Sequence, residues 1–109
     1  MDRNSIALNE VMNDGRTIWL YFDGMAGVYL AYGLSAYYVT MVTDVMVSYS
    51  NDMQMPVALL CRNDVQSLGL HTEMMGYEPE GHLRFQMKRV VGEDGYDTWA
   101  AKCREAVTD

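Results

Sequence analysis

The distribution of apolar residues along the chain predicts four β-strands. Thr17 to Phe22 is a dense apolar run that ends at an Asp-Gly turn, and such a run suits a strand buried on both faces. Val45 to Ser50 and His82 to Val91 alternate apolar with polar residues, which is typical of a strand with one buried face. Met55 to Cys61 has a proline near its start, where the missing amide hydrogen does least damage to a strand.

Helical spacing predicts two internal helices and one more at each end of the chain. From Gly27 to Val42, small and aromatic residues recur at helical intervals and form a stripe that can pack on a sheet. The second internal helix begins at Asn63 or Asp64, either of which can cap it, and closes at Gly76. Terminal helices are expected over Ser5 to Asn13 and from Asp97 onward.

In chain order these elements form a β-α-β-β-α-β core with a helix added at each end. A chain of 109 residues, half of them hydrophobic, has room for one core and no second domain. Glu78 to Gly81 supplies the turn before the fourth strand. The sequence therefore predicts a single α/β domain over residues 1–109, with a small mixed β-sheet and helices packed on it.

The charge balance disfavours anionic partners. There are 8 basic and 15 acidic residues, and the net charge of -7 repels phosphate backbones and anionic lipid. Met25 to Val42 is uncharged and as long as a short membrane helix, but its glycines and tyrosines and its flanking Asp23 and Asp44 favour a buried helix. Met1 to Glu10 lacks the pattern of a secretory signal, so a cytoplasmic location is expected.

No set of residues in the sequence predicts catalysis, a metal site or a cofactor. Cys61 and Cys103 lie far apart and lack metal-ligand spacing, so both are expected to be free thiols. Cys61 follows an apolar strand, and burial in the core is favoured over a nucleophilic role at a helix N-terminus. The two histidines, His71 and His82, are expected at the surface, and the many carboxylates in turns are expected to be solvated. We therefore predict a protein that is not an enzyme.

The succession of strand, Asp-Gly turn, aromatic helix, hairpin and helix resembles the N-terminal, mismatch-recognition domain of MutS-type DNA mismatch repair proteins. In that family, Leu-Leu-Phe-Arg-Met-Gly is followed by Asp-Phe-Tyr-Glu-Leu-Phe and later by Pro-Met-Ala-Gly-Ile. The matching segments here are Trp19 to Gly24, Gly27 to Tyr32 and Pro56 to Leu60. The resemblance spans about Thr17 to Met87 and implies a domain of that fold standing alone, with an accessory role in DNA metabolism.

The residues that read mismatches in that family are missing here. The family uses Phe-x-Glu, in which the ring wedges into a base step and the carboxylate bonds a base edge. With a two-residue insertion after Gly24 the matching positions are Val28 and Leu30, with Tyr29 between them, whereas an ungapped alignment places Ala26 and Val28 there. The sequence also lacks the Gly-x-x-x-x-Gly-Lys-Ser/Thr phosphate loop of the family's ATPase.

Two hypotheses for function follow. The first is a non-enzymatic interaction module that associates with DNA. Its candidate nucleic-acid contacts are the positions of the missing reader and the basic cluster around the fourth strand, namely Val28, Tyr29, Leu30, Arg84, Lys88 and Arg89. The alternative is a purely protein-binding domain that uses surface aromatic residues and its acidic face to bind a partner or a second copy of itself. Neither hypothesis involves a membrane.

Overall fold

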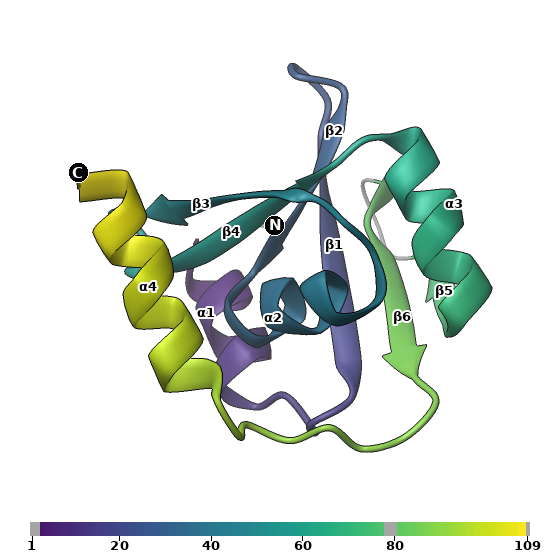
Figure 1. Ribbon diagram of the computed structural model, residues 1–109. Helices are drawn as coiled ribbons and strands as arrows, with labels where there is room; N and C mark the ends of the chain where they lie inside the picture. Colours follow the sequence, from purple (N-terminus) through teal and green to yellow (C-terminus); the bar gives the residue numbers. More distant parts are fainter. Residues whose placement is uncertain (1–2, 78–80, 109) are drawn as a thin grey trace.

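The computed structural model describes residues 3–77 and 81–108, and this part of the chain contains four helices and six strands (Figure 1). The expected turn at Glu78 to Gly81 falls mostly outside the described residues. In chain order the elements are α1 (Arg3–Val11), β1 (Thr17–Asp23), β2 (Val28–Tyr32), α2 (Gly33–Val42), β3 (Met46–Ser50), β4 (Met55–Leu60), α3 (Arg62–His71), β5 (Thr72–Tyr77), β6 (Leu83–Met87) and α4 (Tyr96–Thr108).

The strands form one sheet in the order β3-β4-β2-β1-β6-β5. The predicted α/β class is confirmed, but the expected mixed sheet is wrong, because every neighbouring pair of strands is antiparallel. Two hairpins that the sequence pattern did not reveal, β1–β2 and β5–β6, account for the difference. Tight turns join antiparallel strands, whereas a parallel pair requires a crossover.

The first hidden hairpin corrects the helix predicted over Gly27 to Val42. Val28 to Tyr32 form β2, and only Gly33 to Val42 are helical. The Gly27 amide donates to the Asp23 carbonyl at 2.8 Å and closes the turn, with Gly27 at a φ of +69°. Valine and tyrosine favour strands, and here β2 pairs with β1 and β4, so its side chains pack better extended than helical.

The second hidden hairpin shortens the helix predicted from Asn63 or Asp64 to Gly76. That helix, α3, ends at His71, and Thr72 begins β5, which pairs with β6. The cap is Cys61 instead of either predicted residue, and the Asp64 carboxylate accepts the Cys61 amide hydrogen at 3.0 Å. The observed cap therefore lies two residues before Asn63 and three before Asp64.

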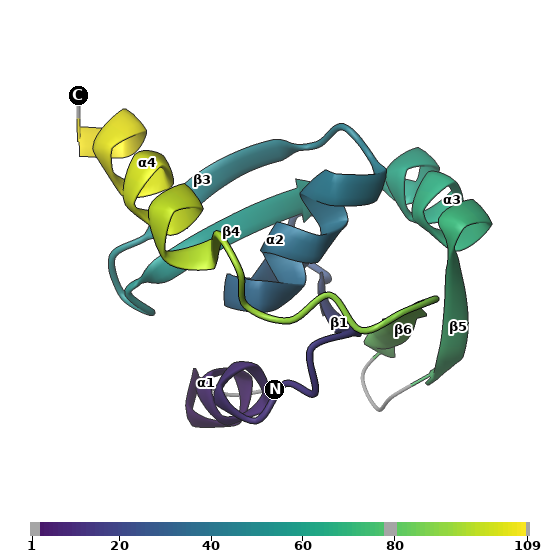
Figure 2. The ribbon, with the colours of Figure 1, turned by 60° about the horizontal axis from the view of Figure 1, so that its bottom comes forward.

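The helices cover the two faces of the sheet unequally. α2, α3 and α4 pack on one face, where the core contains fully buried side chains such as Ile18, Leu20, Tyr38 and Leu68. α1 lies on the opposite face (Figure 2), where the Asn9 side-chain amide donates to the Tyr21 hydroxyl at 3.1 Å. Because α1 has nine residues, it covers only part of that second face.

Aromatic contacts place the start of α4 beside α2. Tyr37 of α2 packs against Trp99 and Tyr96, with ring centroids 5.1 and 5.8 Å apart respectively. The Tyr37 hydroxyl also donates to the Asp94 carbonyl at 2.8 Å, and the Tyr38 hydroxyl donates to the Gly92 carbonyl at 2.7 Å. These bonds fix the loop before α4 beside α2, next to the end of α1.

Candidate functional site

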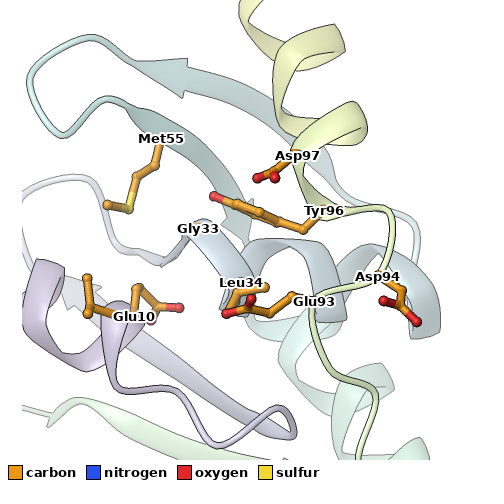
Figure 3. A pocket seen from close by; sticks show the side chains of 9 residues that line it. Glu10, Gly33, Leu34, Met55, Glu93, Asp94, Tyr96 and Asp97 are labelled. Carbon is orange, nitrogen blue, oxygen red and sulfur yellow. The ribbon is translucent and has the colours of Figure 1, made fainter.

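A cavity of about 570 Å³ lies where α1, the N-terminus of α2, the start of β4 and the loop before α4 meet (Figure 3). Its polar lining is acidic, and among the described residues that line it none carries a positive charge. The lining residues are Glu10, Val11, Gly33, Leu34, Met55, Glu93, Asp94, Tyr96 and Asp97.

Glu10 is the buried carboxyl group of this cavity, with only 6% of its surface exposed. Its two oxygens accept hydrogen bonds from the Ser35 amide at 2.9 Å and from the Ser35 hydroxyl at 2.8 Å. The first amides of a helix lack acceptors within the helix, and Tyr32 gives α2 no side-chain cap. Glu10, which belongs to α1, accepts the Ser35 amide and so acts as a cap for α2. The Ser35 hydroxyl oxygen in turn accepts the Trp19 amide at 2.9 Å.

Burial changes the proton affinity of Glu10. Removal from water raises its pKa from 4.5 to about 7, although the hydrogen bonds from Ser35 act in the opposite direction. The carboxyl group therefore changes charge close to neutral pH. Tyr96 does not, because burial raises its pKa to about 12 and keeps its phenol neutral.

The other carboxyl groups stand at the rim. Glu93, Asp94 and Asp97 are exposed, and Figure 3 shows the Glu93 carboxyl pointing toward that of Glu10. Leu34, Met55 and the Tyr96 ring supply apolar surface between them. The arrangement can hold a group that has a positive charge and an apolar stem, since both parts would find a complementary wall.

The structure does not bring the six predicted nucleic-acid residues together. Val28, Tyr29 and Leu30 lie in β2, and the Tyr29 ring packs on the helix-covered face, 5.1 Å from Phe22. Arg84 in β6 stands over the Trp19 ring at 5.4 Å on the other face. The aligned positions Val28 and Leu30 are thus strand residues, and Ala26 of the ungapped alignment lies in the turn before β2, so none of them starts a helix.

Lys88 and Arg89 follow β6 and are exposed. Thr17 pairs with Gln86, and Asp23 pairs with Val28, so the basic pair and Val28 lie near opposite ends of β1. At 3.3 Å per residue these ends are roughly 20 Å apart. The six residues therefore do not form one surface.

Two of the remaining sequence predictions need correction. His82 was expected at the surface but is buried, and its Nδ1 accepts the Phe22 amide at 2.8 Å while the ring packs edge-on against Tyr21. Cys61 was expected in the core but is exposed, because the strand before it has ended and the residue caps α3. His71 is exposed as predicted, and both cysteines are free thiols.

Sequence reasoning missed Glu10 as a site residue and treated Glu93 and Asp94 as solvated turn residues. A signal was present: Glu10 lies one helical turn after Ile6, on the face of the first helix that is buried. Within residues 3–77 and 81–108, no group of three histidine, cysteine or acidic side chains is arranged to hold a metal ion. No helix in the same ranges is long and apolar enough to cross a membrane.

Comparisons with protein-family models, with curated proteins and with solved structures find no match for this chain.

Proposed function

We propose that this domain is a non-enzymatic protein-interaction module whose acidic cavity accepts a lysine or arginine side chain of a partner. The observation that carries the proposal is the combination of one buried and three exposed carboxyl groups around a cavity with apolar walls. A basic side chain matches both features, since its methylene stem packs on apolar surface while its charged end bonds to carboxylates.

Arginine suits the cavity better than lysine. Its planar guanidinium group binds carboxylates through paired hydrogen bonds and also stacks on aromatic rings. Glu10 and Glu93 offer carboxylates from two different elements, and the Tyr96 ring lies in the same wall. The net charge of -7 adds a long-range attraction toward basic partners, which raises the rate of encounter.

A pair of small peptides tests the proposal. The probe is acetyl-Gly-Arg-Gly-amide, and its control carries citrulline, which has the same shape without the charge. Binding is followed by ¹⁵N chemical shifts of the wild-type domain, and we expect a weak interaction for the arginine peptide, with a Kd of about 1 mM. The shifted amides should be those of Gly33, Leu34 and Tyr96.

Two variants with the same change in charge make the test specific. Glu93→Gln/Asp97→Asn removes two rim charges and should weaken binding about fivefold, whereas Glu73→Gln/Glu105→Gln removes two exposed charges elsewhere and should have a much smaller effect. Equal binding of the arginine and citrulline peptides, or an equal loss in both variants, would refute the proposed site.

DNA association, the first hypothesis from the sequence, has one supporting feature. Exposed Lys88 and Arg89 line a cavity of about 410 Å³ together with His71. If this surface binds DNA, a fluorescent mismatched duplex should bind at low salt and lose affinity in Lys88→Gln/Arg89→Gln. We rank it second because the net charge of -7 opposes binding to phosphates.

A further inference from the structure

The open edge of β3 is poorly protected against pairing with another strand. β3 stands at the end of the strand order, and within the described part of the chain its backbone pairs only with β4. Its sequence, Met-Val-Ser-Tyr-Ser, contains no charged residue and no proline, and its register with β4 has no bulge. Natural edge strands usually have one of these features, because an open edge pairs readily with another chain.

The opposite edge of the sheet has such protection. The register between β5 and β6 shifts between Met74 and Gly76, which marks a bulge, and β5 carries the exposed Glu73. Bulges and charges both discourage the addition of a strand. Among the described elements α4 packs against β3, but β3 itself has neither a bulge nor a charged residue, so it is the edge that its own sequence and register protect less.

At its start, β3 borders a second cavity, of about 460 Å³. Val28, Met46 and Leu59 contribute apolar surface to it, and Met46 is 72% exposed, which is high for a large apolar side chain on a strand. Asp44 and Asp64 also line the cavity, so it combines apolar surface with negative charge.

We propose that β3 binds an extended segment of a partner protein by strand addition. One apolar side chain of the segment fills the cavity beside Met46, and a neighbouring lysine or arginine reaches Asp44 and Asp64. Main-chain hydrogen bonds supply affinity in such complexes, while side-chain pockets supply specificity. This surface is distinct from the acidic cavity beside Glu10, and the inference does not depend on that cavity.

A second copy of the chain fits the edge less well than a basic segment. If β3 paired antiparallel with itself over its whole length, the pairing would be symmetric about Ser48 and would bring no opposite charges together, since β3 contains no charged residue. Each copy also has a net charge of -7, so the two would repel one another at longer range.

The test uses the peptide acetyl-Lys-Val-Thr-Val-Thr-Val-Lys-amide and a twin that is N-methylated at alternate residues. The twin keeps the charge and the side chains but loses the amide hydrogens along one edge. We expect the first peptide to bind the domain and to slow amide hydrogen exchange in Met46 to Ser50, and we expect the twin to bind at least about tenfold more weakly.

Ser48→Lys places a charge at the centre of the edge and should weaken binding about fivefold, whereas Gln66→Lys, an equal charge change on the exposed side of α3, should leave it within about twofold. Asp44→Asn should weaken it about threefold. Glu93→Gln/Asp97→Asn should bind this peptide like the wild type, which separates a failure here from a failure of the acidic cavity.

Equal binding of the two peptides, or wild-type binding by Ser48→Lys, would overturn the proposal. Sedimentation equilibrium measures whether the wild-type domain forms a dimer. A wild-type dimer that Ser48→Lys converts to monomer would assign the edge to a second copy and would also overturn the partner-segment proposal.

Discussion

Glu10 links the folding of this domain to its proposed site. The same carboxyl group accepts the Ser35 amide in the first turn of α2, joins α1 to α2 and lies in the wall of the acidic cavity. Burial makes its charged form unfavourable, as the raised pKa records. Both carboxyl oxygens of Glu10 accept hydrogen bonds from Ser35, and an amide, which has one acceptor oxygen, could keep only one of the two bonds unchanged.

The first prediction concerns stability against pH. The folded state holds the Glu10 proton up to a pKa of about 7, and the unfolded state releases it at 4.5, so between these values the folded state binds more protons. The Glu10 contribution to stability is therefore full below the lower value and is lost as pH rises to the higher one, by up to about 3 kcal/mol. Urea unfolding across this range should show the decline, and Glu10→Gln should remove most of it. A wild-type stability that rises over the same range would contradict the account of Glu10.

The loop before α4 gives a second prediction at this scale. Gly95 has a φ of +82°, and a Cβ atom there would stand 2.7 Å from the Tyr37 hydroxyl, whereas Gly92 has a φ of +79° with open space around it. Both Gly→Ala changes incur the cost of the left-handed conformation, about 1–2 kcal/mol, and only Gly95→Ala adds a clash. Thermal unfolding should rank Gly95→Ala below Gly92→Ala, and the reverse order would contradict a close contact between Gly95 and Tyr37.

At the scale of elements, the sequence predicted the positions of strands better than it predicted which strands pair. The segments expected over Thr17 to Phe22, Val45 to Ser50 and Met55 to Cys61 are strands to within one residue at each end, whereas the strand expected over His82 to Val91 covers only Leu83 to Met87. The two missed strands lie in segments whose apolar residues also fit a helix. Val-Tyr-Leu-Ala-Tyr in β2 is apolar throughout, and such short runs carry no period that separates strand from helix.

Contacts with the rest of the sheet determine that these two segments are strands and not helices. β2 lies between β1 and β4, and β5 follows α3 directly, with the Thr72 hydroxyl donating to the Leu68 carbonyl at 2.8 Å where the helix gives way to the strand. Pairing across strands distant in sequence cannot be read from local pattern. The predicted sheet therefore lacked two of its six strands and its antiparallel order.

The third prediction tests how α3 is attached to the sheet. Leu68 is fully buried and Leu70, in the same helix, is 77% exposed. Leu68→Ala should lower the free energy of unfolding by about 2–5 kcal/mol, since it removes packed surface and leaves a cavity, while Leu70→Ala should change it by less than about 0.5 kcal/mol. Chemical denaturation of both variants measures the difference. Equal losses would mean that α3 presents another face to the sheet.

At the scale of the whole molecule, the fold brings together carboxyl groups from the two ends of the chain. Glu10 comes from α1, and Glu93 and Asp97 come from the region where α4 begins. The sequence predicted an acidic protein, but not where its charges meet, because that depends on α1 and α4 converging at the N-terminus of α2. The fold separates the predicted basic cluster. Arg84 lies on the Trp19 ring, while Lys88 and Arg89 lie beyond the end of β6.

The pH dependence of binding to the cavity is the measurement that tests this account most directly. The wild type and Glu10→Gln are titrated with acetyl-Gly-Arg-Gly-amide at pH 6 and pH 8, on either side of the Glu10 pKa of about 7, while ¹⁵N shifts of Gly33 and Tyr96 are recorded. The ionised carboxylate attracts the guanidinium and the protonated acid does not, so the wild type should bind about fivefold more tightly at the higher pH, and Glu10→Gln should bind equally at both. Equal wild-type affinity at the two pH values, or shifts confined to residues outside the cavity, would contradict the proposed function.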